Sequence, residues 1–158
     1  MISNMQKNRA ACHRAAAELI EQVGIDDAFV AKVGRRNFIL AEYAGEIIKV
    51  LVKTKKAGDW QCSLDERPDG ADLYILVDDT QITLEFYSIP PTDMLRLIQE
   101  GHARYMAIEN KARGKRKDHR TINDASRHFR IQIEHVQPFK GWLSALNALE
   151  AKIQEALV

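Results

Sequence analysis

Residues 38–54 read FILAEYAGEIIKVLVKT, and this stretch decides the fold. It is rich in β-branched and aromatic residues on both sides of Ala44-Gly45, a dipeptide suited to a two-residue hairpin turn. With that turn, Tyr43 pairs with Glu46, and pairing back along the hairpin sets Phe38 opposite Leu51. One face is then wholly apolar and must be covered by helices or another layer: Ile39, Ala41, Ile48, Val50 and Val52.

The other face of this hairpin is mixed, with an apolar middle and a lysine near one end. Because side chains alternate along a strand, the same register also determines which residues lie on this second face. It carries Phe38, Leu40, Glu42, Lys49, Leu51 and Lys53.

Further strands and helices follow from composition and periodicity on either side of the hairpin. Apolar residues at helical spacing predict a first helix over 8–22, with Gly24 as its C-terminal cap. A second helix begins at Thr92 or Asp93 and runs to about 108, and a third carries an apolar stripe at the carboxyl terminus. Runs typical of strands cover 28–33, 38–43, 46–54, 72–77, 82–89 and 128–136.

This order predicts an α/β (α+β) fold with a central mixed sheet that contains a β-meander and is flanked by helices. Residues 55–71 are polar and contain glycine and proline, so we expect a loop there, with Trp60 folded back to cover the sheet. The stripe on the last helix is equally consistent with a dimer seam and with docking on the protein's own sheet: Leu146, Leu149, Ile153 and Leu157.

The bulk composition is that of an ordinary globular domain. A chain of 158 residues is long enough for one domain spanning 1–158, and 46% hydrophobic with 28% charged residues excludes fibrous and disordered classes. The polar start lacks a secretory signal, and no apolar run is long enough to cross a bilayer, so we expect a cytoplasmic protein without a membrane partner. Cys12 and Cys62 are predicted to be reduced thiols, with Cys12 packed inside.

Several common chemistries lack their motifs. There is no HExxH or CxxC spacing, no GxSxG elbow, no Walker loop and no dinucleotide-binding glycine pattern. His128 and His135 are seven residues apart on one predicted strand and would point to opposite faces. A histidine metal site, an NTPase and a nucleotide-dependent dehydrogenase are therefore not expected.

Charge is concentrated in one segment. The stretch 111–120 carries a net charge of +5, because Asp118 is its only acid, whereas the whole chain carries +1 and the remainder therefore −4. Such a segment is either a solvated loop or a contact for nucleic-acid phosphates. It contains no aromatic residue to stack on single-stranded bases, which favours duplex DNA as the partner. The candidate contacts are Lys111, Arg113, Lys115, Arg116, Lys117 and Arg120.

The stretch 47–54, IIKVLVKT, is an apolar run that ends in Lys53-Thr54 on the second strand of a hairpin preceded by a helix. In this respect residues 9–87 resemble the PD-(D/E)XK restriction-endonuclease-like superfamily. The resemblance implies a restriction-endonuclease-like sheet and a Mg²⁺-dependent endonuclease. In that family two acidic or amide side chains hold the metal, and a lysine, here Lys53, stabilises phosphate charge.

This sequence departs from the family pattern at the metal ligands. Leu51 stands two residues before Lys53, and Phe38 is the predicted cross-strand neighbour of Leu51. Neither side chain has an oxygen for a hard cation. Glu18 on the first helix or Asp72 on a later strand are the carboxylates that could have migrated to restore part of the site. Otherwise no cofactor is expected, and Lys53 is an isolated catalytic candidate or an ordinary lysine at a strand end.

Three functions remain open. The first is a nuclease-like protein that binds nucleic acid, with weak or no cleavage. The second is a protein-interaction module on the same scaffold, such as an inhibitor or accessory subunit of a defence or mobile-element system. The third is an active metal-dependent endonuclease with rearranged ligands. Fold alone does not choose between them.

Overall fold

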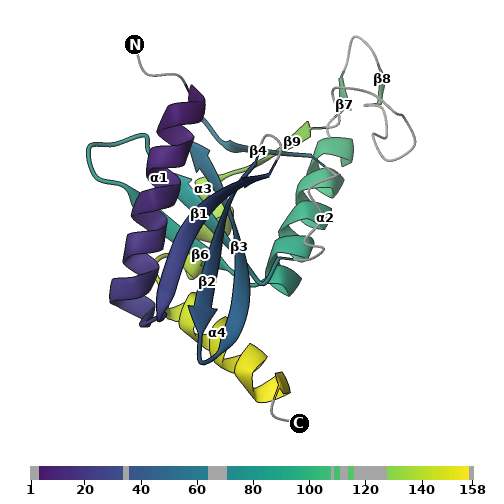
Figure 1. Ribbon diagram of the computed structural model, residues 1–158. Helices are drawn as coiled ribbons and strands as arrows, with labels where there is room; N and C mark the ends of the chain where they lie inside the picture. The colour runs from purple at the N-terminus through teal and green to yellow at the C-terminus, as the bar shows by residue number, and fades with distance from the viewer. Residues whose placement is uncertain are drawn as a thin grey trace.

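The chain has an α+β fold in which a five-stranded mixed sheet lies between two layers (Figure 1). The computed structural model describes residues 4–33, 36–63, 71–107, 109–110, 114–115 and 128–156. The predicted class, a central mixed sheet with a β-meander and flanking helices, is confirmed.

The sheet has the strand order β1-β2-β3-β5-β6. Its neighbours are antiparallel except for β3 and β5, which are parallel. A parallel pair needs a crossover connection, and the chain makes it through residues 56–72. The strands are β1 (Asp27–Val33), β2 (Arg36–Tyr43), β3 (Glu46–Lys55), β5 (Leu73–Asp78) and β6 (Glu85–Ile89).

The predicted hairpin register is confirmed. Tyr43 pairs with Glu46 and Phe38 pairs with Leu51. The turn residues Ala44 and Gly45 both have positive φ, 51° and 83°. Positive φ at both central positions defines the turn whose twist matches that of the flanking strands.

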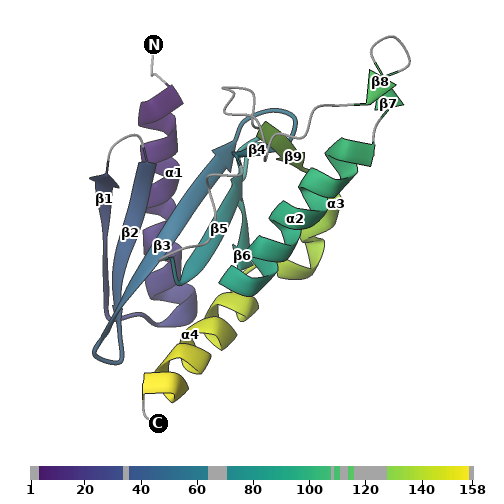
Figure 2. The ribbon, with the colours of Figure 1, turned by 90° about the vertical axis from the view of Figure 1, so that its right-hand side faces the viewer.

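Helices and a small second sheet cover the two faces of the main sheet. One face is covered by α1 (Asn4–Glu18), the π-helical turn η1 (Leu19–Val23) and α4 (Leu143–Ala156). The other is covered by α2 (Pro91–Ala107), α3 (Ile133–Val136) and the turn η2 (Gln137–Phe139), together with the pair β4 (Trp60–Ser63) and β9 (His128–Ile131) (Figure 2). The short pair β7 (Glu109–Asn110) and β8 (Gly114–Lys115) follows α2.

Two apolar clusters, one on each face, form the core. The predicted apolar face of the hairpin packs under α1, where Cys12 is fully buried as expected. Leu149 of α4 is buried in the same cluster and Leu146 packs against it, so this part of the predicted stripe docks on the protein's own sheet, whereas Leu157 lies outside the described residues. Trp60 is buried in the cluster of the opposite face, so its predicted covering role is confirmed.

The predicted strand 128–136 is wrong beyond residue 131. Ile133–Val136 is a helical turn, and the amide of Gln132 donates to Nδ1 of His135 at 3.4 Å, in a capping box. Ile133 and Val136 face the core with the spacing of a helix, not of a strand. His128 and His135 therefore do not lie on one strand.

Two other boundaries differ from the prediction. The predicted strand 82–89 starts only at Glu85, because Asp78 Oδ1 accepts hydrogen bonds from the amide and hydroxyl of Thr80 and ends β5 in a turn. The predicted loop 55–71 contains β4, which pairs with β9. That pairing joins residues far apart in the chain, so local composition gave no signal for it.

None of the helices in the described part of the chain is both long enough and apolar enough to cross a membrane.

The turn offers a test of the register. Ala44 adopts a left-handed conformation that costs about 1 kcal/mol for a residue with a Cβ, and Asn-Gly is the preferred pair for such a turn. We expect Ala44→Asn to raise the free energy of unfolding by about 0.5–1 kcal/mol, measured by urea denaturation. Ala44→Val is the control and should destabilise the fold, because a β-branched residue tolerates positive φ poorly. Equal stability of both variants would contradict the turn geometry.

The buried thiol of Cys12 makes stability depend on alkaline pH. Burial raises the pKa of Cys12 from its ordinary value of 9.0 to about 11. Below pH 9 the thiol is protonated in both states and contributes nothing; between the two values only the unfolded chain loses the proton, so folding weakens as pH rises. By pH 11 we expect a loss of about 2–3 kcal/mol from this group. Urea denaturation at both ends of that window should show a steeper loss for the wild type than for Cys12→Ala, and parallel losses would contradict the assignment.

Candidate nucleic-acid interface

Lys53 lies near the carboxyl end of β3, where it pairs with Leu76 of β5 in the parallel ladder, and its side chain is half-buried. Because side chains alternate along a strand, Lys53 shares one face of the sheet with Lys49 and Lys55. This is the face on which α2 packs, and we call these three residues of β3 the lysine face.

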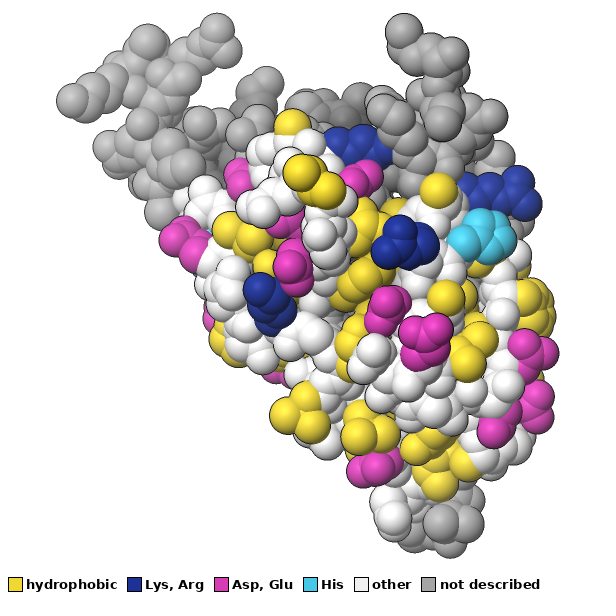
Figure 3. Space-filling model, turned by 90° about the vertical axis from the view of Figure 1, so that its left-hand side faces the viewer, with side chains coloured by type: hydrophobic (Ala, Val, Ile, Leu, Met, Phe, Trp, Pro, Cys, Tyr) yellow, Lys and Arg dark blue, Asp and Glu magenta, His cyan; other side chains and the backbone are white. Residues whose placement is uncertain are grey.

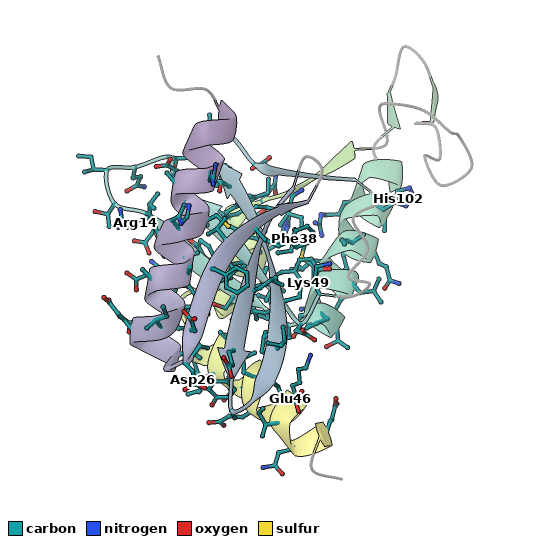
Figure 4. The ribbon with its side chains drawn as sticks, in the orientation of Figure 1. Arg14, Asp26, Phe38, Glu46, Lys49 and His102 are labelled. Carbon is teal, nitrogen blue, oxygen red and sulfur yellow. The ribbon has the colours of Figure 1, made fainter. Side chains whose placement is uncertain are left out.

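Lys49 and Phe38 lie against each other on this face (Figure 4). The ammonium of Lys49 is 4.3 Å from the centre of the Phe38 ring, within range of a cation–π interaction. Both side chains are half-buried. The ring therefore supports the lysine stem while part of the charged group stays accessible to a ligand.

Lys55 has a structural role. It is only 7% exposed, its Nζ donates to the carbonyl of Gly58 at 2.8 Å, and it lies 4.5 Å from the ring centre of Trp60. The indole Nε1 of Trp60 in turn donates to the carbonyl of Val77 at 3.1 Å. These contacts fix the turn from β3 into β4. Sequence reasoning missed them, because a lysine at a strand end ordinarily indicates a solvated side chain.

The positions that would hold a metal beside Lys53 are apolar in three dimensions as well as in sequence. Leu51 is buried and pairs with Phe38, as the register predicted. Across the described residues, no group of three or more His, Cys, Asp or Glu side chains is arranged to hold a metal ion. At the two positions where the resemblance would place oxygen ligands, β2 carries Phe38 and β3 carries Leu51, and both side chains are hydrocarbon.

Asp72 and Glu18 are the two carboxylates that could replace the missing metal ligands beside Lys53, and the structure gives both of them other surroundings. Asp72 accepts the amide of Lys49 at 2.9 Å through Oδ2 and forms an ion pair with Lys152 of α4 through Oδ1. It therefore joins β3, β5 and α4. Glu18 belongs to α1, which packs on the face of the sheet opposite Lys53. Neither completes a site around Lys53.

Most of the basic segment lies outside the described residues, including Lys111, Arg113, Arg116, Lys117 and Arg120. Lys115 belongs to β8, whose backbone pairs with β7 next to the end of α2 (Figure 1). The described chain leads toward this segment from α2, which ends at Ala107, and continues after it at His128 of β9. We call these two points the anchors of the segment.

Those two anchor points lie on the side of the sheet that carries Lys53. The segment follows α2, which packs on this face, and it returns through β9, which pairs with β4 directly after β3. Figures 1 and 2 show that β3 ends and α2 ends at the same end of the molecule. Lys53 and both anchors of the segment are therefore on one face and toward one end.

The opposite side of the molecule has a different surface. Figure 3 shows the α1 side, where the few Lys and Arg side chains among the described residues are scattered between Asp and Glu. Arg9 and Arg14 of α1 are exposed, and Arg14 points away from the sheet (Figure 4). They provide natural controls for the role of charge.

Comparisons with models of protein families, with curated proteins and with solved structures found no match to this chain. The resemblance to the restriction-endonuclease-like superfamily thus rests on residues 47–54 and on the element order.

The structural role of Asp72 is testable. Asp72→Ala removes the acceptor for the Lys49 amide and the partner of Lys152, so we expect a loss of about 2–4 kcal/mol in the free energy of unfolding. Asp72→Asn keeps an acceptor oxygen and should lose less. A double-mutant cycle with Lys152→Met, followed by urea denaturation, isolates the ion pair. If Asp72 were instead a catalytic ligand, Asp72→Ala would leave stability nearly unchanged.

Proposed function

We propose that this protein binds nucleic acid, with duplex DNA as the preferred ligand, without cleaving it efficiently. The contacts are made by segment 111–120 and by Lys53 at the end of the lysine face. The observation that carries the proposal is the common location of Lys53 and both anchors of the segment on one face and at one end of the fold.

Electrostatics supports binding through this end. A segment with net charge +5 in a chain of net charge +1 concentrates the attraction for phosphates, while the acids elsewhere disfavour other orientations. Each lysine or arginine that neutralises a phosphate releases counterions, which makes affinity fall with salt. Lys53 adds a cation from the rigid sheet next to the segment.

The apolar neighbours of Lys53 support binding without efficient cleavage. Hydrolysis of a phosphodiester by the family mechanism needs a divalent cation that activates water. Leu51 and Phe38 provide no ligand for it, and Asp72 is held by Lys49 and Lys152. The role in the family mechanism that the sequence of this chain retains is contact with phosphate by Lys53 as a point charge.

A second function, a protein-interaction module, is favoured by exposed apolar residues. Phe29 of β1 is 59% exposed and Ile47 of β3 is 65% exposed. Both lie on the face of the sheet that carries Lys49, and apolar side chains exposed together on one face are a feature of protein-interaction surfaces. An inhibitor or accessory subunit of a defence or mobile-element system would use such a surface.

Matched pairs of arginine substitutions test the proposal. Arg113→Gln with Arg116→Gln should weaken duplex binding and reduce the slope of log K against log salt by about 1.8, because each lost phosphate contact changes it by about 0.9. Arg9→Gln with Arg14→Gln removes the same charge from the α1 side and should leave the slope unchanged. Fluorescence anisotropy across a salt series, with single-stranded DNA and RNA as further ligands, measures both.

The same reactions, run with Mg²⁺ or Mn²⁺ and followed on a denaturing gel, test for cleavage. Intact strands with salt-dependent binding are expected. Equal effects of the two arginine pairs would place the contact elsewhere. No binding at any salt concentration would favour the protein-interaction module, and efficient cleavage would overturn the proposed loss of activity.

A further inference from the structure

Helix α2 covers only part of the sheet face that carries Lys53. It contacts β5 and β9, its buried side chains pack on β3, β5 and β6, and none of the described helices lies in front of β1 and β2 on this face (Figure 2). These two strands present Phe29, Phe38 and Leu40 there. Among the described residues, Phe29 and Leu40 belong to neither core cluster, and Phe38 packs only against the edge of one. This part of the face is therefore available to a ligand.

Two aromatic rings are neighbours in the area that α2 leaves open. Phe29 of β1 is mostly exposed and Phe38 of β2 is half-buried. Phe29 pairs with Leu40, which stands two residues from Phe38, so the two phenylalanines are diagonal neighbours on one face. The Cβ atoms of such neighbours are about 7–8 Å apart. Rings spaced in this way on a sheet can each stack with one base of a single-stranded nucleic acid.

The charges on this face change from acidic to basic along the strands. Asp27 and Glu42 are exposed near the hairpin turn, whereas Lys53 lies toward the end of β3. Lys49 lies between these ends, and its ammonium is 4.3 Å from the centre of the Phe38 ring. A polyanion is therefore attracted to the rings and to the Lys53 end, and it is repelled from the turn.

Lys49 can exchange its partner when a nucleotide binds. Its ammonium is a point charge on a flexible four-carbon stem, so it can leave the Phe38 ring and meet the phosphate of a base that stacks there. The attraction between the cation and the ring is then replaced by attraction between the cation and the phosphate. Aromatic rings combined with cations are the means by which proteins hold single strands.

Unpaired bases are the ligand that these rings select. Segment 111–120 contains no aromatic residue, so it attracts phosphates but cannot stack with bases. In a duplex the bases are already paired and stacked on one another, so a ring on the sheet surface cannot reach their faces. The segment and the sheet face therefore suit adjacent parts of one ligand, a duplex and a strand that leaves it.

We propose that the face of β1 and β2 binds unpaired nucleotides through Phe29, Phe38 and Lys49, and that the preferred ligand is a duplex with a single-stranded tail. This role rests on the proposed function, the binding of duplex DNA by Lys53 and segment 111–120, and adds a second contact that depends on stacking. Because one ligand makes both contacts, the second forms at the high effective concentration set by the first.

Fluorescence anisotropy with a blunt duplex, and with the same duplex carrying a thymidine tail at either end, tests the stacking contact. The wild type should bind a tailed duplex about tenfold more tightly than the blunt one, which is the usual scale of one stacked base. Phe29→Leu keeps an apolar side chain but removes the ring, so it should lose most of this preference and bind the blunt duplex normally. Phe29→Trp keeps a stacking surface and should retain the preference, and its indole fluorescence should be quenched by the tailed duplex.

Ile47→Ala is the matched control. Ile47 is similarly exposed on the same face but lies beside the acids, so this variant should keep the preference for the tail. Circular dichroism and thermal midpoints establish that each variant folds.

The outcomes separate the stacking contact from the proposed function. Equal binding of blunt and tailed duplexes by the wild type, a preference that Phe29→Leu leaves intact, or the same loss in Ile47→Ala would each overturn the stacking contact, while binding of the blunt duplex would still support the proposed function. No binding of either ligand would overturn both and leave this face to a protein partner.

Discussion

The burial of β5 on both of its faces is the constraint on which the rest of the fold depends. All six residues of this strand, Leu73–Asp78, are buried. Alternate side chains belong to the two different core clusters, so neither covering layer can be omitted. The parallel alignment with β3 adds a second requirement, since the chain must cross from the end of β3 back to the start of β5. The crossover contributes β4 and Trp60, whose indole donates to Val77 of the strand it covers.

The hairpin of β2 and β3 could be predicted from sequence because its information is local. Ala44-Gly45 sets the turn, and the turn sets which residues share a face. The apolar surroundings of Lys53 followed from the same register. By contrast, the ion pair of Asp72 with Lys152 joins residues 80 positions apart, and the β4–β9 pair closes a similarly long loop. Such contacts depend on how the layers pack, so no period or composition signals them.

The mistakes at strand ends have a related cause. Residues 131 and 133 fit the period of a strand, but Gln132 caps a helical turn that buries Val136. The composition of residues 82–89 predicts that Ile82 begins a strand, but this residue is fully exposed after the turn at Asp78. In each case a hydrogen bond from a backbone amide to a polar side chain outweighed the strand preference of an apolar residue. Lys55 is the opposite case, because here the burial of a charged residue was missed. Its ammonium is stabilised in the core by the ring of Trp60 and by the hydrogen bond to the carbonyl of Gly58.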